Sequence, residues 1–110
     1  MTQPEQAVLM WPVLALAARM QRVLTYSELE GLTGILRVGQ NDALHLIYLY
    51  CEKKHYPLLN SIVVNQETGF PGDKHPKKMT PEEFLVERAK VFAFNWSAED
   101  KPRPQHFSNA

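Results

Sequence analysis

The sequence predicts an α+β fold, a winged helix-turn-helix of about four helices with a small β wing. Three local patterns predict it. A capping pattern at Thr25 starts a short segment that ends at two glycines, and a longer amphipathic segment follows. A β-branched run then leads into a turn at Gly69, and a second capping pattern at Thr80 starts a last helix. This order of elements is typical of a helix-turn-helix with a β wing.

The first predicted helix lies in the stretch from Ala7 to Arg22, where few polar residues interrupt the apolar ones. Such a pattern indicates a largely buried helix. Pro12 either kinks the helix or lies in its first turn, so we expect the helix proper to begin at about Trp11. The apolar stretch is shorter than the roughly 18 residues of a membrane span, and no secretory signal precedes it. We therefore expect a cytoplasmic protein that does not contact a membrane.

Two further helices joined by a tight turn are predicted next. Thr25 and Glu28 form a capping box, and Gly31 and Gly34 tolerate the left-handed backbone that ends a short helix. The following helix, from about residue 40 to residue 54, has apolar positions at helical spacings: Leu44, Ile47, Tyr48 and Cys51. The second helix of such a pair commonly enters a DNA groove, although helical pairs also occur simply as core structure.

The predicted wing begins with a strand over Ser61–Val64, a run rich in β-branched residues. Residues 66–69 supply a turn, with Gly69 available for positive φ. Phe70 and Pro71 extend a returning edge only briefly, because proline donates no ladder hydrogen bond. The polar, basic segment from Asp73 to Lys78 is predicted to be an exposed loop.

The last predicted helix is capped by Thr80, with Pro81 in its first turn, and runs to about Phe94. Its core face is predicted to comprise Phe84, Val91 and Phe94, with Trp96 just beyond. Residues 1–96 are thus expected to form a single winged-helix-type domain. Residues 97–110, which have no apolar period, are expected to form a loosely ordered C-terminal tail.

Known catalytic and cofactor motifs are absent from the sequence. The histidines at 45, 55, 75 and 106 lack metal-ligand spacing, so no metal is predicted. Cys51 lies on the apolar stripe of its helix and is predicted to be a core residue. There is no glycine-rich phosphate loop and no Gly-x-Ser-x-Gly motif, so we expect neither a cofactor nor catalytic activity.

The run Leu24–Leu29, followed by Gly31 and Gly34, resembles the Thr-Tyr-Gly-x-Leu-Ala opening of the DNA-binding domain of alkylguanine alkyltransferases and alkyltransferase-like proteins. The resemblance covers roughly residues 24 to 72 and implies a winged helix that binds duplex DNA. In this resemblance, Arg37 corresponds to the family's arginine at the start of the recognition helix. The family's Pro-Cys-His-Arg motif is missing after Pro57, so alkyl transfer is not expected.

The order of several short motifs also resembles a group of small uncharacterised bacterial proteins. These motifs include Trp11-Pro12, Tyr50-Cys51 and Phe94-Asn95-Trp96. This resemblance spans most of the chain, and it implies a bacterial or phage origin and the same fold.

Two functions remain open. In the first, the protein binds duplex DNA through the second helix of the helix-turn-helix and the basic loop. The residues expected to contact DNA are Arg37, Gln40, Asn41 and His45 of that helix and Lys74, Lys77 and Lys78 of the loop. A solvated polar helix face is the alternative for the helix residues. The chain has 12 Lys and Arg against 12 Asp and Glu, so it lacks the basic excess typical of DNA-binding domains.

In the second, the same fold binds a protein partner, as an immunity protein, an antitoxin or a phage counter-defence protein would. Its small size and neutral charge fit this function equally well. Exposed aromatic side chains would favour it, because interface anchors are enriched in Tyr and Trp. The candidates are Tyr48, Tyr50, Tyr56 and Trp96. The oligomeric state is left open by the sequence.

Overall fold

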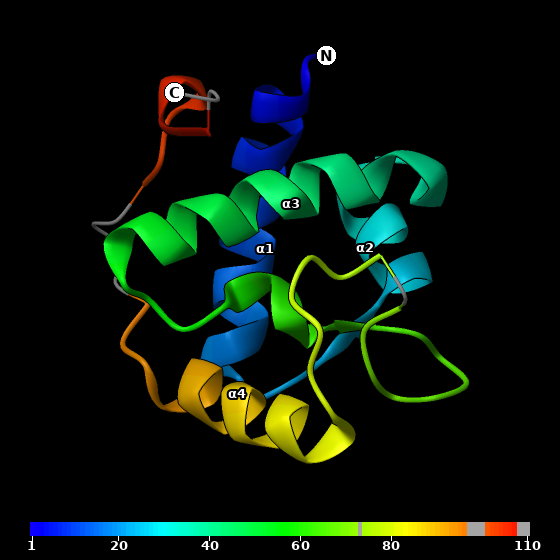
Figure 1. Cartoon of the computed structure of the whole chain (residues 1–110). Coiled ribbons are helices and arrows are strands. Elements are labelled where there is room, and N and C mark those ends of the chain that lie inside the picture. The colour runs from blue at the N-terminus through cyan, green and yellow to red at the C-terminus, as the bar shows by residue number, and fades with distance from the viewer. Residues whose placement is uncertain (73, 97–100, 108–110) are drawn as a thin grey trace.

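The computed structural model describes residues 1–72, 74–96 and 101–107. Its order of elements is α1 (Gln3–Arg19), β1 (Leu24–Thr25), α2 (Tyr26–Thr33), α3 (Arg37–Lys54), the 3-10 helix η1 (Leu59–Ile62), β2 (Val63–Val64), α4 (Pro81–Ala93) and the 3-10 helix η2 (Pro104–Phe107). The described residues therefore form an α+β fold with four α-helices and one two-stranded sheet. In Figure 1, α3 crosses in front of α1, α4 lies at the far end of α1, and η1 and the sheet lie between α3 and α4.

Helix α1 begins at Gln3, so the prediction of a start at about Trp11 is wrong. The reason is a capping box at the extreme N-terminus. Glu5 N–H donates to Thr2 Oγ1 at 3.2 Å, and Thr2 N–H donates to Glu5 Oε1 at 2.8 Å. Pro12 accordingly lies inside the helix, on an exposed position.

The predicted pair of helices is present as α2 and α3. The capping box of Thr25 and Glu28 forms as predicted, and Gly34 ends α2 with a φ of 75°. Helix α3 begins at Arg37 rather than at about residue 40. Its own N-cap, Leu36, makes no side-chain cap, and the Arg37 N–H instead donates to Glu30 Oε1 of α2 at 3.0 Å. A side chain of the first helix thus satisfies a free donor of the second.

The predicted wing forms only in part. Val63–Val64 is a strand, but Ser61 and Ile62 belong to η1. Strand β2 pairs in parallel with β1, and in the described part of the chain no returning strand follows it. The turn at Gly69 is present, with Asn65 N–H donating to the carbonyl of Phe70 at 2.8 Å. The expected return therefore reduces to a single hydrogen-bonded turn before Pro71.

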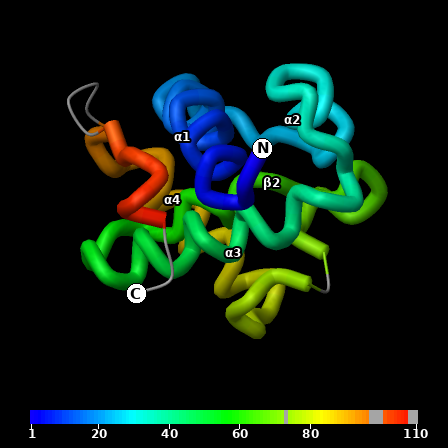
Figure 2. The backbone as a smooth tube through the Cα atoms, turned by 90° about the horizontal axis from the view of Figure 1, so that it is seen from above, coloured from blue at the N-terminus to red at the C-terminus, as the bar shows by residue number. Residues whose placement is uncertain are grey.

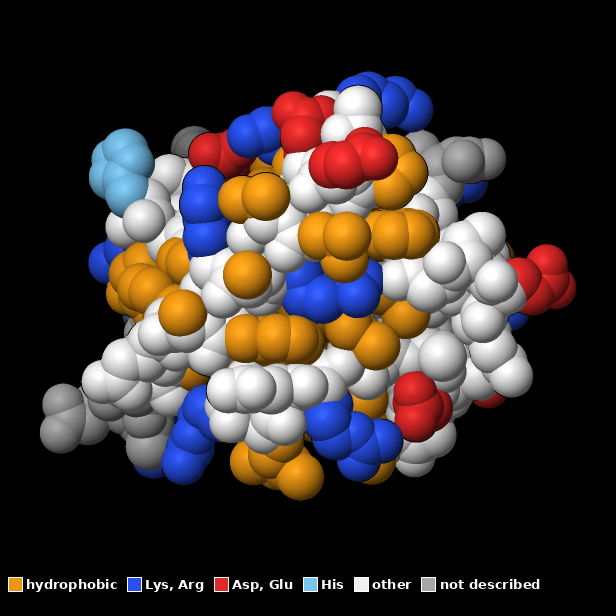
Figure 3. Space-filling model, turned by 90° about the horizontal axis from the view of Figure 1, so that it is seen from below, with side chains coloured by type: hydrophobic (Ala, Val, Ile, Leu, Met, Phe, Trp, Pro, Cys, Tyr) orange, Lys and Arg blue, Asp and Glu red, His pale blue; other side chains and the backbone are white. Residues whose placement is uncertain are grey.

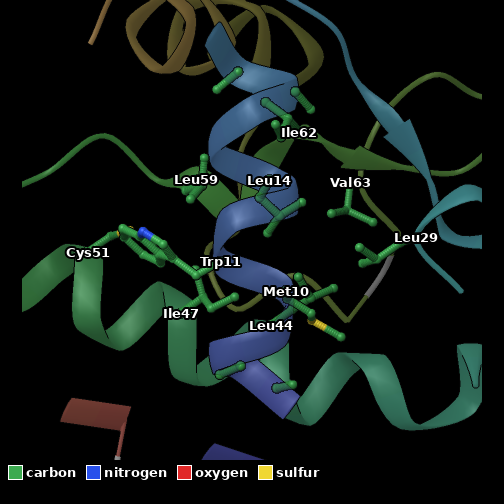
Figure 4. Close-up of a cluster of buried hydrophobic side chains, with 14 of the residues drawn as sticks. Met10, Trp11, Leu14, Leu29, Leu44, Ile47, Cys51, Leu59, Ile62 and Val63 are labelled. Atoms are coloured by element: carbon green, nitrogen blue, oxygen red, sulfur yellow. The ribbon is translucent and has the colours of Figure 1, made fainter. Parts of the chain in front are cut away.

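The core is built around α1. Figure 4 shows side chains of α1 between α3 and the η1–β2 segment. Leu44, Ile47 and Cys51 of α3 are buried in this core, as predicted. Tyr48 is only half-buried at its margin. Phe84 lies outside the core, in edge-on contact with the His75 ring at 5.1 Å between centroids.

Helix α4 confirms the prediction of a helix capped by Thr80. Val91 and Trp96 are buried, whereas Phe94 is half-buried. In the part of the chain that the structure describes, no helix combines the length and the apolar character needed to cross a bilayer.

The predicted loose tail is wrong for residues 101–107; residues 97–100 and 108–110 lie outside the described residues. The 3-10 helix η2 packs against α1 and α3, as Figure 2 shows. Phe107 is 2% exposed, and its ring lies 5.2 Å from that of Tyr50 and 6.1 Å from that of Trp11. Burial of this one aromatic side chain ties the segment to the core.

Candidate nucleic-acid interface

Two neighbouring surface hollows lie where α2, α3 and the turn after β2 meet. Their volumes are about 450 Å³ and about 270 Å³, and both are lined by Tyr26, Arg37 and Asn65. The smaller hollow is also lined by Asn41 and Lys74. Three residues predicted to contact DNA, from two separate segments, therefore border one hollow.

Tyr26 contacts both α3 and the segment that follows the turn after β2. The guanidinium of Arg37 lies over its ring, 5.6 Å from the centroid. Its hydroxyl accepts a hydrogen bond from the Gly72 N–H at 3.2 Å. Gly72 begins the segment from 72 to 79, here called the lysine loop, in which residue 73 lies outside the described residues. One side chain of α2 thereby places both Arg37 and the start of the lysine loop.

The polar flank of α3 consists of residues one helical turn apart. Arg37 and His45 are exposed, and Asn41 between them is half-buried. Residues four apart lie on the same side of a helix, so these three side chains form a row beside the lysine loop. Lys54 belongs to the opposite flank, where its ammonium lies over the Tyr50 ring at 5.8 Å.

Gln40 does not belong to this row, so its predicted contact with DNA is wrong. Its side chain is 0% exposed. The amide nitrogen donates to the carbonyl of Tyr26 at 3.0 Å and to the carbonyl of Ile35 at 3.1 Å. These two bonds join α3 to the first turn of α2 and to the turn between the helices.

The three lysines of the lysine loop are exposed, as predicted. Lys74 faces the hollow beside Arg37. Lys77 and Lys78 line a separate hollow of about 190 Å³ with His75 and Phe84. Figure 3 shows the molecule from below, and the face that it draws mixes apolar, basic and acidic side chains rather than gathering one sign of charge.

A buried polar cluster behind the lysine loop was not predicted from the sequence, which indicated only that His75 belongs to a basic loop. His75 Nε2 lies 3.0 Å from Ser61 Oγ and 3.2 Å from Asn60 Nδ2. Its Nδ1 lies 2.9 Å from the carbonyl oxygen of Lys77 and accepts from the Lys77 N–H at 3.1 Å. The signal that could have revealed the cluster is the pair Asn60-Ser61, which interrupts the apolar run from Leu58 to Val64.

The Ser61–His75 pair has the spacing of a nucleophile and its base. Ser61 is, however, only 2% exposed, so its hydroxyl is closed to a substrate in this structure. Burial lowers the pKa of His75 below the usual 6.5, against smaller opposing effects of the Lys77 carbonyl and the Glu87 carboxylate. Among the described residues, no group of His, Cys, Asp and Glu side chains is arranged to hold a metal ion.

The aromatic side chains expected at a protein interface are mostly inside. Tyr50 and Trp96 are buried, and Tyr48 and Tyr56 are half-buried. Apolar side chains are instead exposed at the turn between α2 and α3, at 61% for Leu32, 64% for Leu36 and 86% for Val38.

No protein-family model, curated protein or solved structure matches this chain. The resemblance to the alkyltransferase DNA-binding domain therefore stays a prediction.

Proposed function

We propose that this chain is a winged-helix protein without catalytic activity that binds duplex DNA. The contacts come from the polar flank of α3 and from the lysine loop. The observation that carries the proposal is the hollow that Arg37, Asn41 and Lys74 line together. Two cations and a carboxamide from separate segments converge there, and these are the residue types that hold phosphates and recognise base edges.

The contacts divide into two kinds. Exposed lysines make phosphate contacts that set affinity and its salt dependence but carry no sequence information. Asn41 is the base-reading candidate, since a carboxamide can make two hydrogen bonds to adenine. Arg37 serves either role, because a guanidinium pairs with guanine as well as with phosphate. His45 lies one turn further along the same flank.

Titration of short duplexes at low salt tests the proposal, because non-specific attraction is strongest there. Replacing Lys74, Lys77 and Lys78 by alanine should weaken binding to every duplex similarly. For each lysine that bonds a phosphate, the replacement should reduce the magnitude of the slope of log affinity against log salt by about 0.9. Lys54→Ala, which removes an exposed charge from the opposite flank of α3, is the matched control and should leave the slope unchanged.

Asn41→Ala should instead change which sequence is preferred, with a loss of about 1–3 kcal/mol at one base pair. If the intact protein binds no duplex at low salt, the proposal is wrong.

A protein partner is the second candidate, and the exposed apolar group Leu32, Leu36 and Val38 favours it. Exposed apolar side chains that cluster at one turn are typical of a contact surface. An immunity protein, an antitoxin or a phage counter-defence protein would use such a surface. Val38→Glu separates the two candidates, because it should abolish a protein contact at this turn. Its effect on DNA binding should be limited to the charge that it adds.

A further inference from the structure

The lysine loop connects the turn after β2 to the start of α4. It contains no helix or strand among its described residues, and its lysine side chains are exposed. Gly72 is tied to Tyr26 at its start. His75, in its middle, is half-buried, and its Nε2 points toward Asn60 and Ser61 of η1. This ring is the inward anchor of the loop.

The partners of His75 come from three elements. Asn60 and Ser61 of η1 contact Nε2. Phe84 of α4 meets the ring edge-on at 5.1 Å, and Tyr48 of α3 meets it edge-on at 6.5 Å. The Nδ1 side of the ring bonds the backbone of Lys77, which folds the loop around it. His75 therefore joins the middle of the loop to α3, η1 and α4, while Gly72 contacts Tyr26 at the start of the loop and Met79 packs against the core at its end.

The buried pair on the other side of this contact depends on the ring. Asn60 is 3% exposed and Ser61 is 2% exposed. Among the described residues, the Asn60 Oδ1 is buried without a hydrogen-bond partner. Polar groups left unpaired in the interior are destabilising. If the loop moved away, Asn60 Nδ2 and Ser61 Oγ would lose the His75 partner as well, so the pair favours the docked loop.

We propose that His75 is a positioning residue, which latches the lysine loop onto Asn60 and Ser61 and so holds Lys74, Lys77 and Lys78 in place for the phosphates of bound DNA. The latch rests on the proposed DNA-binding function for its purpose, but not for its geometry. A loop held in its bound position loses less conformational entropy when DNA binds, so the latch raises affinity without adding any bond to the DNA.

The latch is also pH-sensitive. A neutral imidazole has one donor and one acceptor nitrogen, whereas the imidazolium has no acceptor. Protonation therefore ends the ring's ability to accept from the Lys77 N–H or from the Asn60 amide. The titratable groups facing the ring are Lys77 of the loop, Glu87 of α4 and Tyr48 of α3, and η1 contributes only neutral side chains. Because burial lowers the pKa of His75, the ring is neutral at pH 7 and the latch is closed.

The rate of trypsin cleavage in the loop tests the latch without DNA, because trypsin cleaves after lysines and the loop contains three of them. His75→Ala should be cleaved in the loop about tenfold faster than the wild type, the factor expected from one net hydrogen bond. Ser61→Ala removes a partner of His75 from η1 and should also speed cleavage in the loop. His45→Ala is the matched control, since this exposed histidine bonds none of the described residues of the loop and should leave the rate unchanged.

A pH series distinguishes the latch from simple packing. With rates normalised to cleavage of an unfolded peptide spanning 70–82, the wild type should be cleaved faster as pH falls from about 7.5 to about 5.5. His75→Gln, which cannot titrate, should show no such change. Duplex affinity of His75→Ala should fall about tenfold at fixed salt, while the salt slope, which reflects the phosphates bound, changes little.

The outcomes separate the two proposals. If His75→Ala and Ser61→Ala are cleaved no faster than the wild type, the latch is wrong, whatever the DNA result. If cleavage is faster but duplex affinity is unchanged, the positioning role is wrong. A wild type that binds no duplex overturns the proposed function and the phosphate-positioning role with it, while faster cleavage of the variants would still support the latch itself.

Discussion

Replacement of Gln40 by alanine tests the geometry of the helix pair most directly. A base-reading glutamine would affect sequence preference and leave stability alone. The structure predicts the reverse, because the Gln40 amide is buried and donates to the carbonyls of Tyr26 and Ile35. Each of these two bonds contributes about 0.5–1.5 kcal/mol net, so their loss should destabilise the fold by about 1–3 kcal/mol.

Two further effects of this substitution oppose each other. Alanine leaves a cavity, which adds to the loss of stability. It also removes Gln40 Oε1, a buried acceptor that has no partner among the described residues, and this relieves part of the cost. The expected loss therefore stays at about 1–3 kcal/mol.

Urea unfolding measures the loss. With a slope of about 1–3 kcal/mol per molar, the midpoint should fall by about 1 M while the slope itself is unchanged. Asn41→Ala is the matched control, one position along α3 and half-buried on the polar flank, and it should change stability by less than about 0.5 kcal/mol. If Gln40→Ala were as stable as the control and altered duplex preference instead, Gln40 would face the ligand and the described helix packing would be refuted.

Three further predictions concern the core, the C-terminal segment and pH. Leu44→Ala should lower the free energy of unfolding by about 2–5 kcal/mol, because the side chain is 6% exposed, and a loss below about 0.5 kcal/mol would mean that α3 is turned the other way. Phe107→Ala should cost about 3–5 kcal/mol in the same urea assay, and an unchanged midpoint would show that residues 101–107 do not pack on Trp11 and Tyr50. Because the folded pKa of His75 lies below the usual 6.5, the unfolded chain takes up the proton first as pH falls. The free energy of unfolding should therefore decrease from about pH 6.5 downward until the folded pKa is passed, and an equal decrease in His75→Gln would contradict this assignment.

The starts of α2 and α4 could be predicted because a capping box is a local signal. Thr25 and Thr80 each accept from a backbone N–H three residues on, and both boxes formed as expected. The same signal was present at Thr2 and Glu5. Pro12 is compatible with the first turn of a helix, and the prediction based on that proline therefore places the start of α1 too late.

The wing and the buried polar residues could not be predicted because their partners are distant in the sequence. The β-branched composition of Ser61–Val64 favours a strand, yet only Val63 and Val64 meet a partner, at Leu24 and Thr25 of β1. Residue type alone likewise does not decide whether a glutamine on a helix contacts a ligand or donates hydrogen bonds to backbone carbonyls inside the protein. For Gln40 the decision depends on where α2 lies, which is a tertiary property.

The residues that position the proposed DNA-binding side chains differ from those that would touch the DNA. Tyr26 contacts Arg37 through its ring, the lysine loop through its hydroxyl and Gln40 through its carbonyl. His75 fixes the middle of the same loop. Arg37 and Lys74, which follow these contacts, border one hollow. A chain with equal numbers of acidic and basic residues can still bring two cations, Arg37 and Lys74, to one hollow.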